Sequence, residues 1–352
     1  MNRTVTSTAG IFLVVLIGYL LIAGRGLLIP IVIALFIWNL LNTLNNAMRR
    51  IPRLGLFLPG WLSMLLSLLV VVGMGNVLID IITDNVNDVI TASSRYQENL
   101  VHIMSHVDKH YRLRALASFN EFLQDLKIQD IVVKFYGVFT TLTGSAVLIG
   151  LYVVFLFVEQ HFFKQKMDAL FPQAAHRKLV DSILSHITND TQMYLGIKTL
   201  LSVSTALVSW IIMKAVGLDF AEFWALLIFF LNYIPNIGAM VATIFPALLA
   251  LVQFESWVPF AVITSGFAIV HFVVGNLLEP RLLGNSLNLS PLVILFALAL
   301  WGAIWGILGM FLAVPITVMM LILSAHFEST RPIAVLLSQN GYVEKSYQKM
   351  KE

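Results

Sequence analysis

Apolar blocks long enough to cross a membrane recur along this chain, and they limit its fold more than any other feature. A hydrocarbon core about 30 Å thick requires about 20 apolar residues of helix. Inside such a core only helices and closed barrels satisfy every backbone polar group. We therefore predict an all-α, polytopic integral membrane protein with about eight transmembrane elements. The blocks lie at 10–23, 27–41, 61–82, 135–158, 199–216, 220–252, 259–278 and 292–327.

The amino-acid composition agrees with this class and argues against several functional classes. The chain is 59% hydrophobic and 12% charged, whereas soluble domains carry about a quarter charged residues. It has no cysteine, which excludes disulfides, thiolate metal sites and thiol catalysis. A net charge of +3 gives no argument for nucleic acid as a partner. Because H-E-x-x-H, G-x-S-x-G and Walker motifs are missing, we expect no enzyme, no ATP-driven pump, no cofactor and no metal ion.

The basic residues predict the topology. Arg49, Arg50 and Arg53 follow the first pair of apolar blocks, so the positive-inside rule places that loop, and both chain termini, in the cytoplasm. The predicted domains are N-terminal transmembrane helices (1–82), an amphipathic helical extracytoplasmic insert (83–134), a transmembrane helix with cytoplasmic interfacial helices (135–198), a transport core with broken helices and a terminal hairpin (199–327), and a cytoplasmic tail (328–352).

The stretch "FFLNYIPNIGAMVATIFP", Phe229 to Pro246, breaks a helix inside an apolar block. Pro235 removes a helical hydrogen bond and Gly238 permits a sharp bend. One interpretation is a proline kink whose own asparagines bond the freed backbone groups. The other, which we favour because a second break follows, is a discontinuous helix whose ends face a solute near the membrane midplane. The candidate solute contacts are Asn232, Tyr233 and Asn236.

A second break lies in "HFVVGNLLEPRLLG". Ionisable groups at membrane depth are costly and are functional candidates. Glu279 and Arg281 flank Pro280 and could pair with each other or with a neighbouring repeat, while a salt bridge in an interfacial loop is an equal alternative. Together with Asn276 they are candidate solute contacts. His271 and Glu279 are candidates for proton coupling, although a lone histidine on an apolar helix is more often a packing residue.

The block 292–327 is the third interruption. As one helix its 36 residues would extend about 54 Å, too long for a single crossing. Gly302, Gly306, Gly309 and Pro315 supply the break, so we expect a helical hairpin or two spans. The remaining predicted helix-break positions are Pro235, Gly238, Pro246, Pro280 and Gly284.

Two groups of polar residues with helical spacing lie outside the predicted spans. The histidines could bind a metal ion, but without a clear fourth ligand a solvated stripe is favoured. The aspartates could collect cations at a pore mouth, but a helix emerging into water is the simpler interpretation. The groups are His102, His106 and His110, and Asp80, Asp84 and Asp88.

The motifs "LNYIPNIG", "VVGNLLEPRLLG", "LNLSPLVILFALALWGAIWGILGMFLAVP" and "IAVLLS" occur in this order. In them the chain resembles the autoinducer-2 exporter family, in particular its quorum-sensing signal exporter branch. The sequence departs from the family pattern at Thr43 and Ala239, where many relatives have proline, and at Glu279, where glutamine is frequent. The matching positions are Asn232, Pro235, Gly238, Pro246, Asn276, Pro280, Gly284, Leu289, Pro291, Gly302, Gly306, Gly309 and Pro315.

The resemblance implies a bacterial inner-membrane exporter of autoinducer-2 or a similar small polar metabolite. It also implies a homo-oligomer in contact with lipid, and a pentamer is among the candidate assemblies. In such an oligomer a mobile transport region would move against a fixed one. Two alternatives stay open. One is a sodium or lithium/proton antiporter that uses Glu279 and the aspartate stripe. The other is a non-transporting scaffold or channel-like oligomer whose insert at 83–134 binds partners or lipid.

Overall fold

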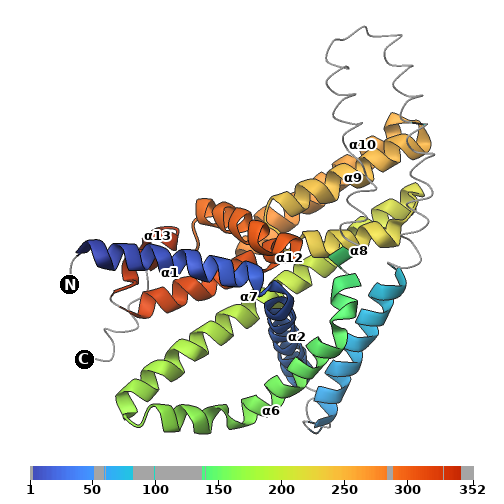
Figure 1. Ribbon diagram of the computed structural model, residues 1–352. Helices are drawn as coiled ribbons and strands as arrows, with labels where there is room; N and C mark the ends of the chain where they lie inside the picture. The colour runs from blue at the N-terminus through green and yellow to red at the C-terminus, as the bar shows by residue number, and fades with distance from the viewer. Residues whose placement is uncertain are drawn as a thin grey trace. The chain divides into compact units, whose positions relative to one another are not determined.

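The computed structural model describes residues 3–50, 59, 61–81, 99, 137–138, 140–283, 288–327 and 329–341 (Figure 1). Within these ranges the regular elements are helices, together with one isolated bridge between Leu289 and Ser338. Seven helices are long and apolar enough to cross a membrane, and Ala221–Leu231 is a shorter apolar helix. The predicted all-α, polytopic class is confirmed.

The chain divides into two compact units. Helix α7, Ala174–Val216, contributes to both, since its residues up to Gly196 belong to the first unit and those from Ile197 to the second. At 43 residues and about 65 Å, α7 joins the predicted cytoplasmic helices and the following span into one continuous helix. The first unit is Met1–Ser67, Leu142–Gly196 and Asn285–Glu352, and the second is Leu68–Thr141 and Ile197–Gly284.

The first unit is built on long apolar helices. The first two meet at Gly24, where a Cβ atom would lie 2.8 Å from the carbonyl oxygen of Leu20. Trp38 donates a hydrogen bond to Gln160 over 3.1 Å, and Trp305 donates one to the carbonyl of Leu21 over 3.0 Å. The helices, besides the start of α7, are α1 Arg3–Ala23, α2 Arg25–Arg50, α6 Ala146–Leu170, α12 Pro291–His326 and α13 Arg331–Leu337.

Helix α12 reverses direction within its length. Gly306 has non-helical angles, φ 66° and ψ −142°. A Cβ atom on Gly309 would lie 1.9 Å from the carbonyl oxygen of Trp301, and one on Gly302 would lie 3.0 Å from the side chain of Met310. Residues eight apart on a straight helix are about 12 Å apart, so these contacts require a helical hairpin with its tip at 302–309. The predicted break in this block is therefore present, at Gly306.

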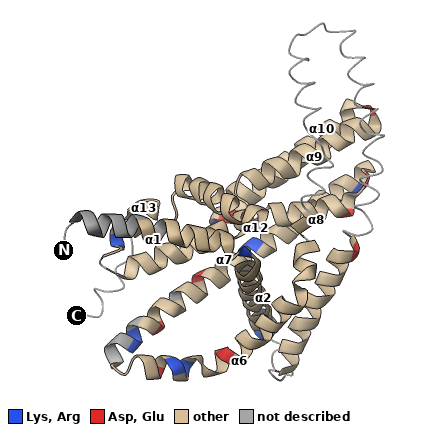
Figure 2. Cartoon of the chain, in the orientation of Figure 1, with Lys and Arg blue, Asp and Glu red and all other residues tan. Residues whose placement is uncertain are grey.

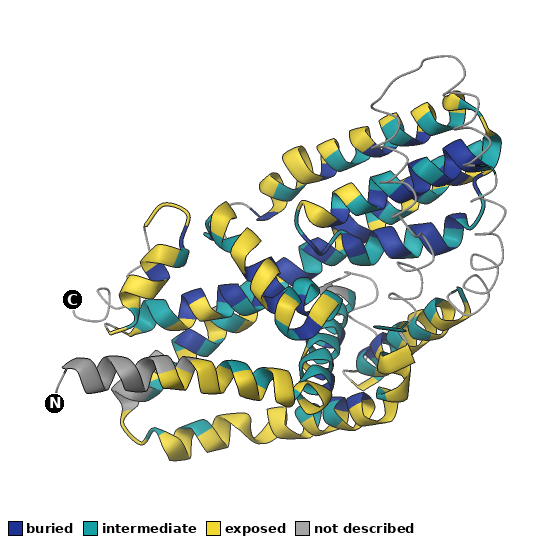
Figure 3. Ribbon diagram, turned by 45° about the horizontal axis from the view of Figure 1, so that its top comes forward, coloured by how far each residue is buried: buried dark blue, intermediate teal, exposed yellow. Residues whose placement is uncertain are grey.

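The second unit contains a re-entrant hairpin, which we define as residues 219–254. It comprises α8, Ala221–Leu231, and α9, Ile237–Phe254. Its base is closed by Gln253, which accepts a hydrogen bond from the backbone N–H of Asp219 (2.9 Å) and donates one to the carbonyl of Gly217 (3.0 Å). The hairpin therefore begins and ends at the same level, beside the end of α7. About half of the residues in its helices are buried (Figure 3).

The hairpin is followed by α10, Trp257–Phe272, by the π-helix η1, Val273–Leu278, and by α11, Glu279–Leu283. Helices α9 and α10 carry no charged residue, whereas α6 and the first part of α7 carry many (Figure 2). Asp80 is exposed near the end of the helix Trp61–Ile81. Predictions for most of the insert at 83–134 lie outside the described residues, as do Gly284 and the tail beyond residue 341. The same holds for Asp84, Asp88, His102, His106 and His110.

Candidate functional site

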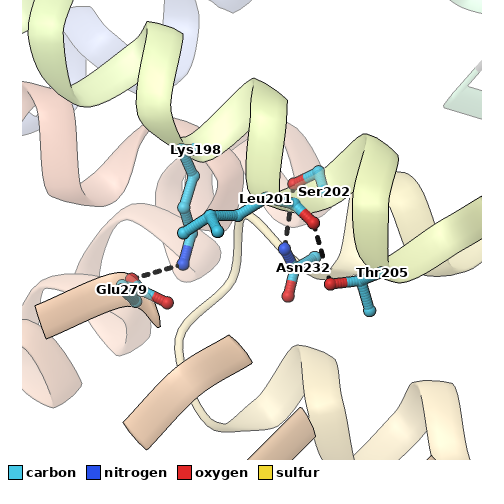
Figure 4. A network of polar contacts seen from close by, with 6 residues as sticks. All are labelled: Lys198, Leu201, Ser202, Thr205, Asn232 and Glu279. Atoms are coloured by element: carbon cyan, nitrogen blue, oxygen red, sulfur yellow. Dashed lines mark hydrogen bonds and ion pairs between the residues drawn. The ribbon is translucent and has the colours of Figure 1, made fainter. Parts of the chain in front are cut away.

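The tip of the re-entrant hairpin is hydrogen-bonded to α7. The Nδ2 of Asn232 donates to the Oγ of Ser202 over 3.0 Å. The hydroxyls of Tyr233 and Thr199 share a hydrogen bond of 2.6 Å. Figure 4 shows Asn232 directed at α7, where Lys198, Ser202 and Thr205 project from one helix. The tip therefore contacts the middle part of a long helix through polar side chains.

The backbone at the tip is non-helical. Asn236 has φ 60° and ψ −54°, and a Cβ atom on Gly238 would lie 1.7 Å from the carbonyl oxygen of Leu231. Only glycine permits that approach of α9 to the end of α8. The side chain of Asn232 bonds Ser202 on α7 rather than the hairpin's own backbone. Asn236 is exposed, and its side chain has no hydrogen bond within the described part of the chain. The geometry is thus a discontinuous helix rather than a self-bonded kink.

A partly buried ion pair lies beside this tip. The Nζ of Lys198 is 2.6 Å from a carboxylate oxygen of Glu279, and the two side chains are 3% and 26% exposed. Glu279 stands where η1 passes into α11. A buried charge is tolerated when it is paired and hydrogen-bonded. Each of these two groups therefore compensates the charge of the other.

Glu279 thus does not pair with Arg281, one of the partners that the sequence predicts. Residues two apart on a helix do not face each other, and Arg281 is exposed, without an ion pair among the described residues. The π-helix that precedes Glu279 holds Asn276, which is also exposed. Short π-helical segments are frequent at functional sites. His271 lies in the last turn of α10, and its Nε2 is buried without a partner in the described part.

Three of the predicted prolines lie within helices instead of separating them. Pro246 is inside α9 and Pro315 inside α12, while exposed Pro280 is in the first turn of α11. A single proline removes one hydrogen bond, which a long packed helix tolerates. The chain reverses at 232–236 and at Gly306 instead.

The distance from the base of the hairpin to its tip follows from α7. Lys214 pairs with Glu222 over 2.6 Å at the base of the hairpin, and both are substantially exposed. Ser202 and Lys198 are 12 and 16 residues before Lys214, about 18 Å and 24 Å along the helix. In a hydrocarbon core about 30 Å thick, a position of the Asn232–Ser202 contact near the midplane stays a prediction.

Lys198 and Ser202 are functional candidates that the sequence analysis does not identify. Lys198 falls at the end of the predicted cytoplasmic segment, among other basic residues. Their spacing of four residues places both on one face of a helix. That spacing, at the start of an apolar block, is the pattern that could have identified them.

The comparisons with known proteins agree with this architecture. A family model described as "AI-2E family transporter" matches residues 11–329. The chain belongs to the AI-2E transporter family. The resemblance stated from the sequence motifs is thereby confirmed, and the broken helices lie within the matched region of this AI-2E transporter.

Relatives cover much or nearly all of the chain. The AI-2 transport protein TqsA of Escherichia coli K12 is 29% identical over 96% of this chain and 98% of its own length. A protein of Borreliella burgdorferi, provisionally named a transport protein, is 30% identical over 69% of this chain and 67% of its own. YhhT of Escherichia coli K12, also provisionally named a transport protein, is 33% identical over 61% of each chain. The chain is therefore a multi-pass membrane protein of a transporter family.

Proposed function

We propose that this AI-2E transporter is a secondary exporter of autoinducer-2 or a similar small polar metabolite. The observation that carries the proposal is the tip of the re-entrant hairpin, where Asn232 and Tyr233 bond the hydroxyls of Ser202 and Thr199. A re-entrant segment with polar contacts inside a membrane protein is typical of secondary transporters. The name of the TqsA relative supports the choice of solute.

The chemistry of the tip fits an uncharged, hydroxylated solute. Amide and hydroxyl groups both donate and accept hydrogen bonds, and the nearby charges of Lys198 and Glu279 compensate each other. Asn236, exposed and without a side-chain hydrogen bond in the described part, offers a further amide. A few polar groups of this kind fix the orientation of a small ligand. Asn276 and Arg281 remain proposed contacts and His271 a proposed proton-coupling residue.

The wider setting belongs to the same proposal. We place the protein in the bacterial inner membrane, in contact with lipid, with both termini in the cytoplasm because of the basic loop at 49–53. Export of autoinducer-2 would make it a quorum-sensing component. A homo-oligomer, a pentamer among the candidates, follows from the family resemblance alone.

Efflux from cells tests this function. Deleting the gene should raise intracellular autoinducer-2, and re-expressing the wild-type protein should lower it again. Asn232→Ala and Asn236→Gly should fail to do so while reaching the membrane in normal amounts. Glycine is chosen at 236 because it accepts the positive φ of that residue. A loss of efflux in this variant is then due to the missing side-chain amide. Ser265→Ala on α10, whose hydroxyl bonds its own helix, is the matched control. Normal efflux by both asparagine variants would refute the proposed contacts.

A sodium or lithium/proton antiporter is the second candidate, and the carboxylate of Glu279 within this unit is the observation that favours it. A cation would have to displace the ammonium of Lys198 before it reached that carboxylate. Everted vesicles with a pH-sensitive dye should then show cation-induced dequenching that Glu279→Gln abolishes. The absence of a cation response at any pH would remove this candidate. A scaffold is less favoured because it has no use for a re-entrant hairpin.

A further inference from the structure

One face of α7 carries a stripe of buried polar side chains, Lys198, Ser202, Thr205 and Ser209. They are 3%, 0%, 0% and 0% exposed. The spacing of four, three and four residues keeps them on one side of the helix, and they extend about 16 Å along it. Most polar residues at membrane depth are kept for a partner or a pathway.

Ser209 shows that the stripe is not simply satisfied by its own helix. Serine and threonine in apolar helices usually bond the carbonyl four residues earlier. Thr205 does so with Leu201 at 2.8 Å, and off the stripe Ser204 does so with Leu200 at 2.9 Å. The hydroxyl of Ser209 is buried and has no partner within the described part of the chain. An orphaned buried hydroxyl indicates a position where something else can bond.

Helix α8 runs beside this stripe. At one end Trp210 donates to Glu222 over 3.4 Å, and at the other Asn232 donates to Ser202 over 3.0 Å. Helix α8 therefore runs antiparallel to α7 between these two contacts. Ser209 lies seven residues after Ser202 and faces nearly the same way, so its hydroxyl lies on the side of α7 that receives the hydrogen bond of Asn232.

The two helices of the hairpin form one packed body. They pack on each other, with Trp224 and Phe245 stacked at a centroid distance of 6.4 Å, and α9 also packs on α10. The bonds that hold its tip to α7 are neutral, Asn232 to Ser202 and Tyr233 to Thr199. Neutral hydrogen bonds contribute little net stability each, so the tip can separate from α7 without breaking the Lys198–Glu279 pair.

We propose that the stripe is the surface along which an uncharged, hydroxylated solute moves, and that the re-entrant hairpin is the cover that exposes it. The hydroxyls of Ser202, Thr205 and Ser209 donate and accept hydrogen bonds without adding charge. The solute would replace the bond of Asn232 to Ser202 and then use the free hydroxyl of Ser209. The inference rests on the proposed transport function and names the path and the moving element.

Thiol labelling tests the inference without knowledge of the solute. The chain has no cysteine, so Thr205→Cys and Ser209→Cys can be studied singly in the full protein reconstituted in liposomes. The probe is a water-soluble, positively charged methanethiosulfonate. Both thiols should react, and adding Asn232→Ala should accelerate the reaction about fivefold, the effect of removing one hydrogen bond that holds the cover closed. Ser204→Cys lies on the same helix but off the stripe and is the matched control. Its labelling rate should not change when Asn232→Ala is added.

Two results would overturn the inference. One is that the cysteines at 205 and 209 stay as unreactive as the one at 204 in both backgrounds. The other is that all three accelerate together, which would mean general loosening of the unit. Tyr233→Phe provides a second, independent loosening variant should Asn232→Ala fail to fold. Because labelling needs no solute, a protein that labels as expected but exports no autoinducer-2 would refute the proposed solute and not the path.

Discussion

At the scale of single residues, the pair formed by Lys198 and Glu279 is more deeply buried than the Lys214–Glu222 pair, which also lies in the second unit. Lys198 is almost fully buried, and its ammonium has the Glu279 carboxylate at 2.6 Å. Removing one member of such a pair leaves the other charge without compensation, which costs more than removing both. The pair is thus a structural requirement whether or not it also takes part in transport.

We predict that Lys198→Met lowers the stability of the folded protein by about 1–3 kcal/mol, because Glu279 loses its partner. Glu279 keeps some solvent, with its side chain 26% exposed, which holds the loss below that of a fully buried pair. The double variant Lys198→Met, Glu279→Gln should recover much of the loss. The melting temperature in detergent checks this. A double variant less stable than the single one would contradict it.

Sequence reasoning singled out Glu279, but of the pairings it left open the one with Arg281 is wrong, and it did not name Lys198. Basic residues in this part of the chain are dense, from Lys164 to Lys178, and the positive-inside rule groups Lys198 with them. A partner 81 residues away depends on how α7 packs against α11, which no local pattern encodes. By contrast, Asn232 was identified because an amide beside Pro235 in an apolar block is anomalous on its own.

At the scale of elements, two helical hairpins share one packing device. In each, a glycine just after the reversal lets the returning helix approach a carbonyl of the outgoing helix: Gly238 against Leu231, and Gly309 against Trp301. The need for a break in 292–327 could be predicted, because length alone forbids a single span. The continuity of α7 could not, since a polar first half and an apolar second half look like separate helices.

Gly238→Ala should be strongly destabilising. The added Cβ would lie 1.7 Å from the carbonyl oxygen of Leu231, and backbone cannot move aside as a flexible side chain can. We expect a loss of about 3 kcal/mol, the upper end of the range for overpacking, seen as a lower melting temperature or reduced yield. Gly150→Ala on α6 is the control, because a Cβ there meets nothing within 4 Å. Equal stability of the two variants would contradict the tight turn.

Distance measurements test the hairpin within α12. Leu295 and Met320 are 47% and 46% exposed, so spin labels are tolerated at both. On a straight helix these positions would be about 37 Å apart. The reversal at Gly306 predicts a much shorter distance by pulsed electron paramagnetic resonance. A distribution centred near the straight-helix value would show that the block is a single helix.

At the scale of the whole molecule, the family and the helical membrane class were predictable because they rest on block lengths and on motifs that recur in order. The partners of the polar side chains at the hairpin tip were not. Asn232 contacts Ser202 and Tyr233 contacts Thr199, which lie 30 and 34 residues earlier in the chain. Contacts over such separations depend on how the hairpin packs on α7, which no local sequence pattern encodes.

Transport by the purified protein is the most direct test of the central claim. Liposomes loaded with labelled autoinducer-2 should release it faster when they contain the wild-type protein, with and without an imposed pH gradient to show any proton coupling. Liposomes with Asn232→Ala should release it several-fold more slowly at equal protein content. Release by wild-type protein no faster than from empty liposomes, under either condition, would contradict the account.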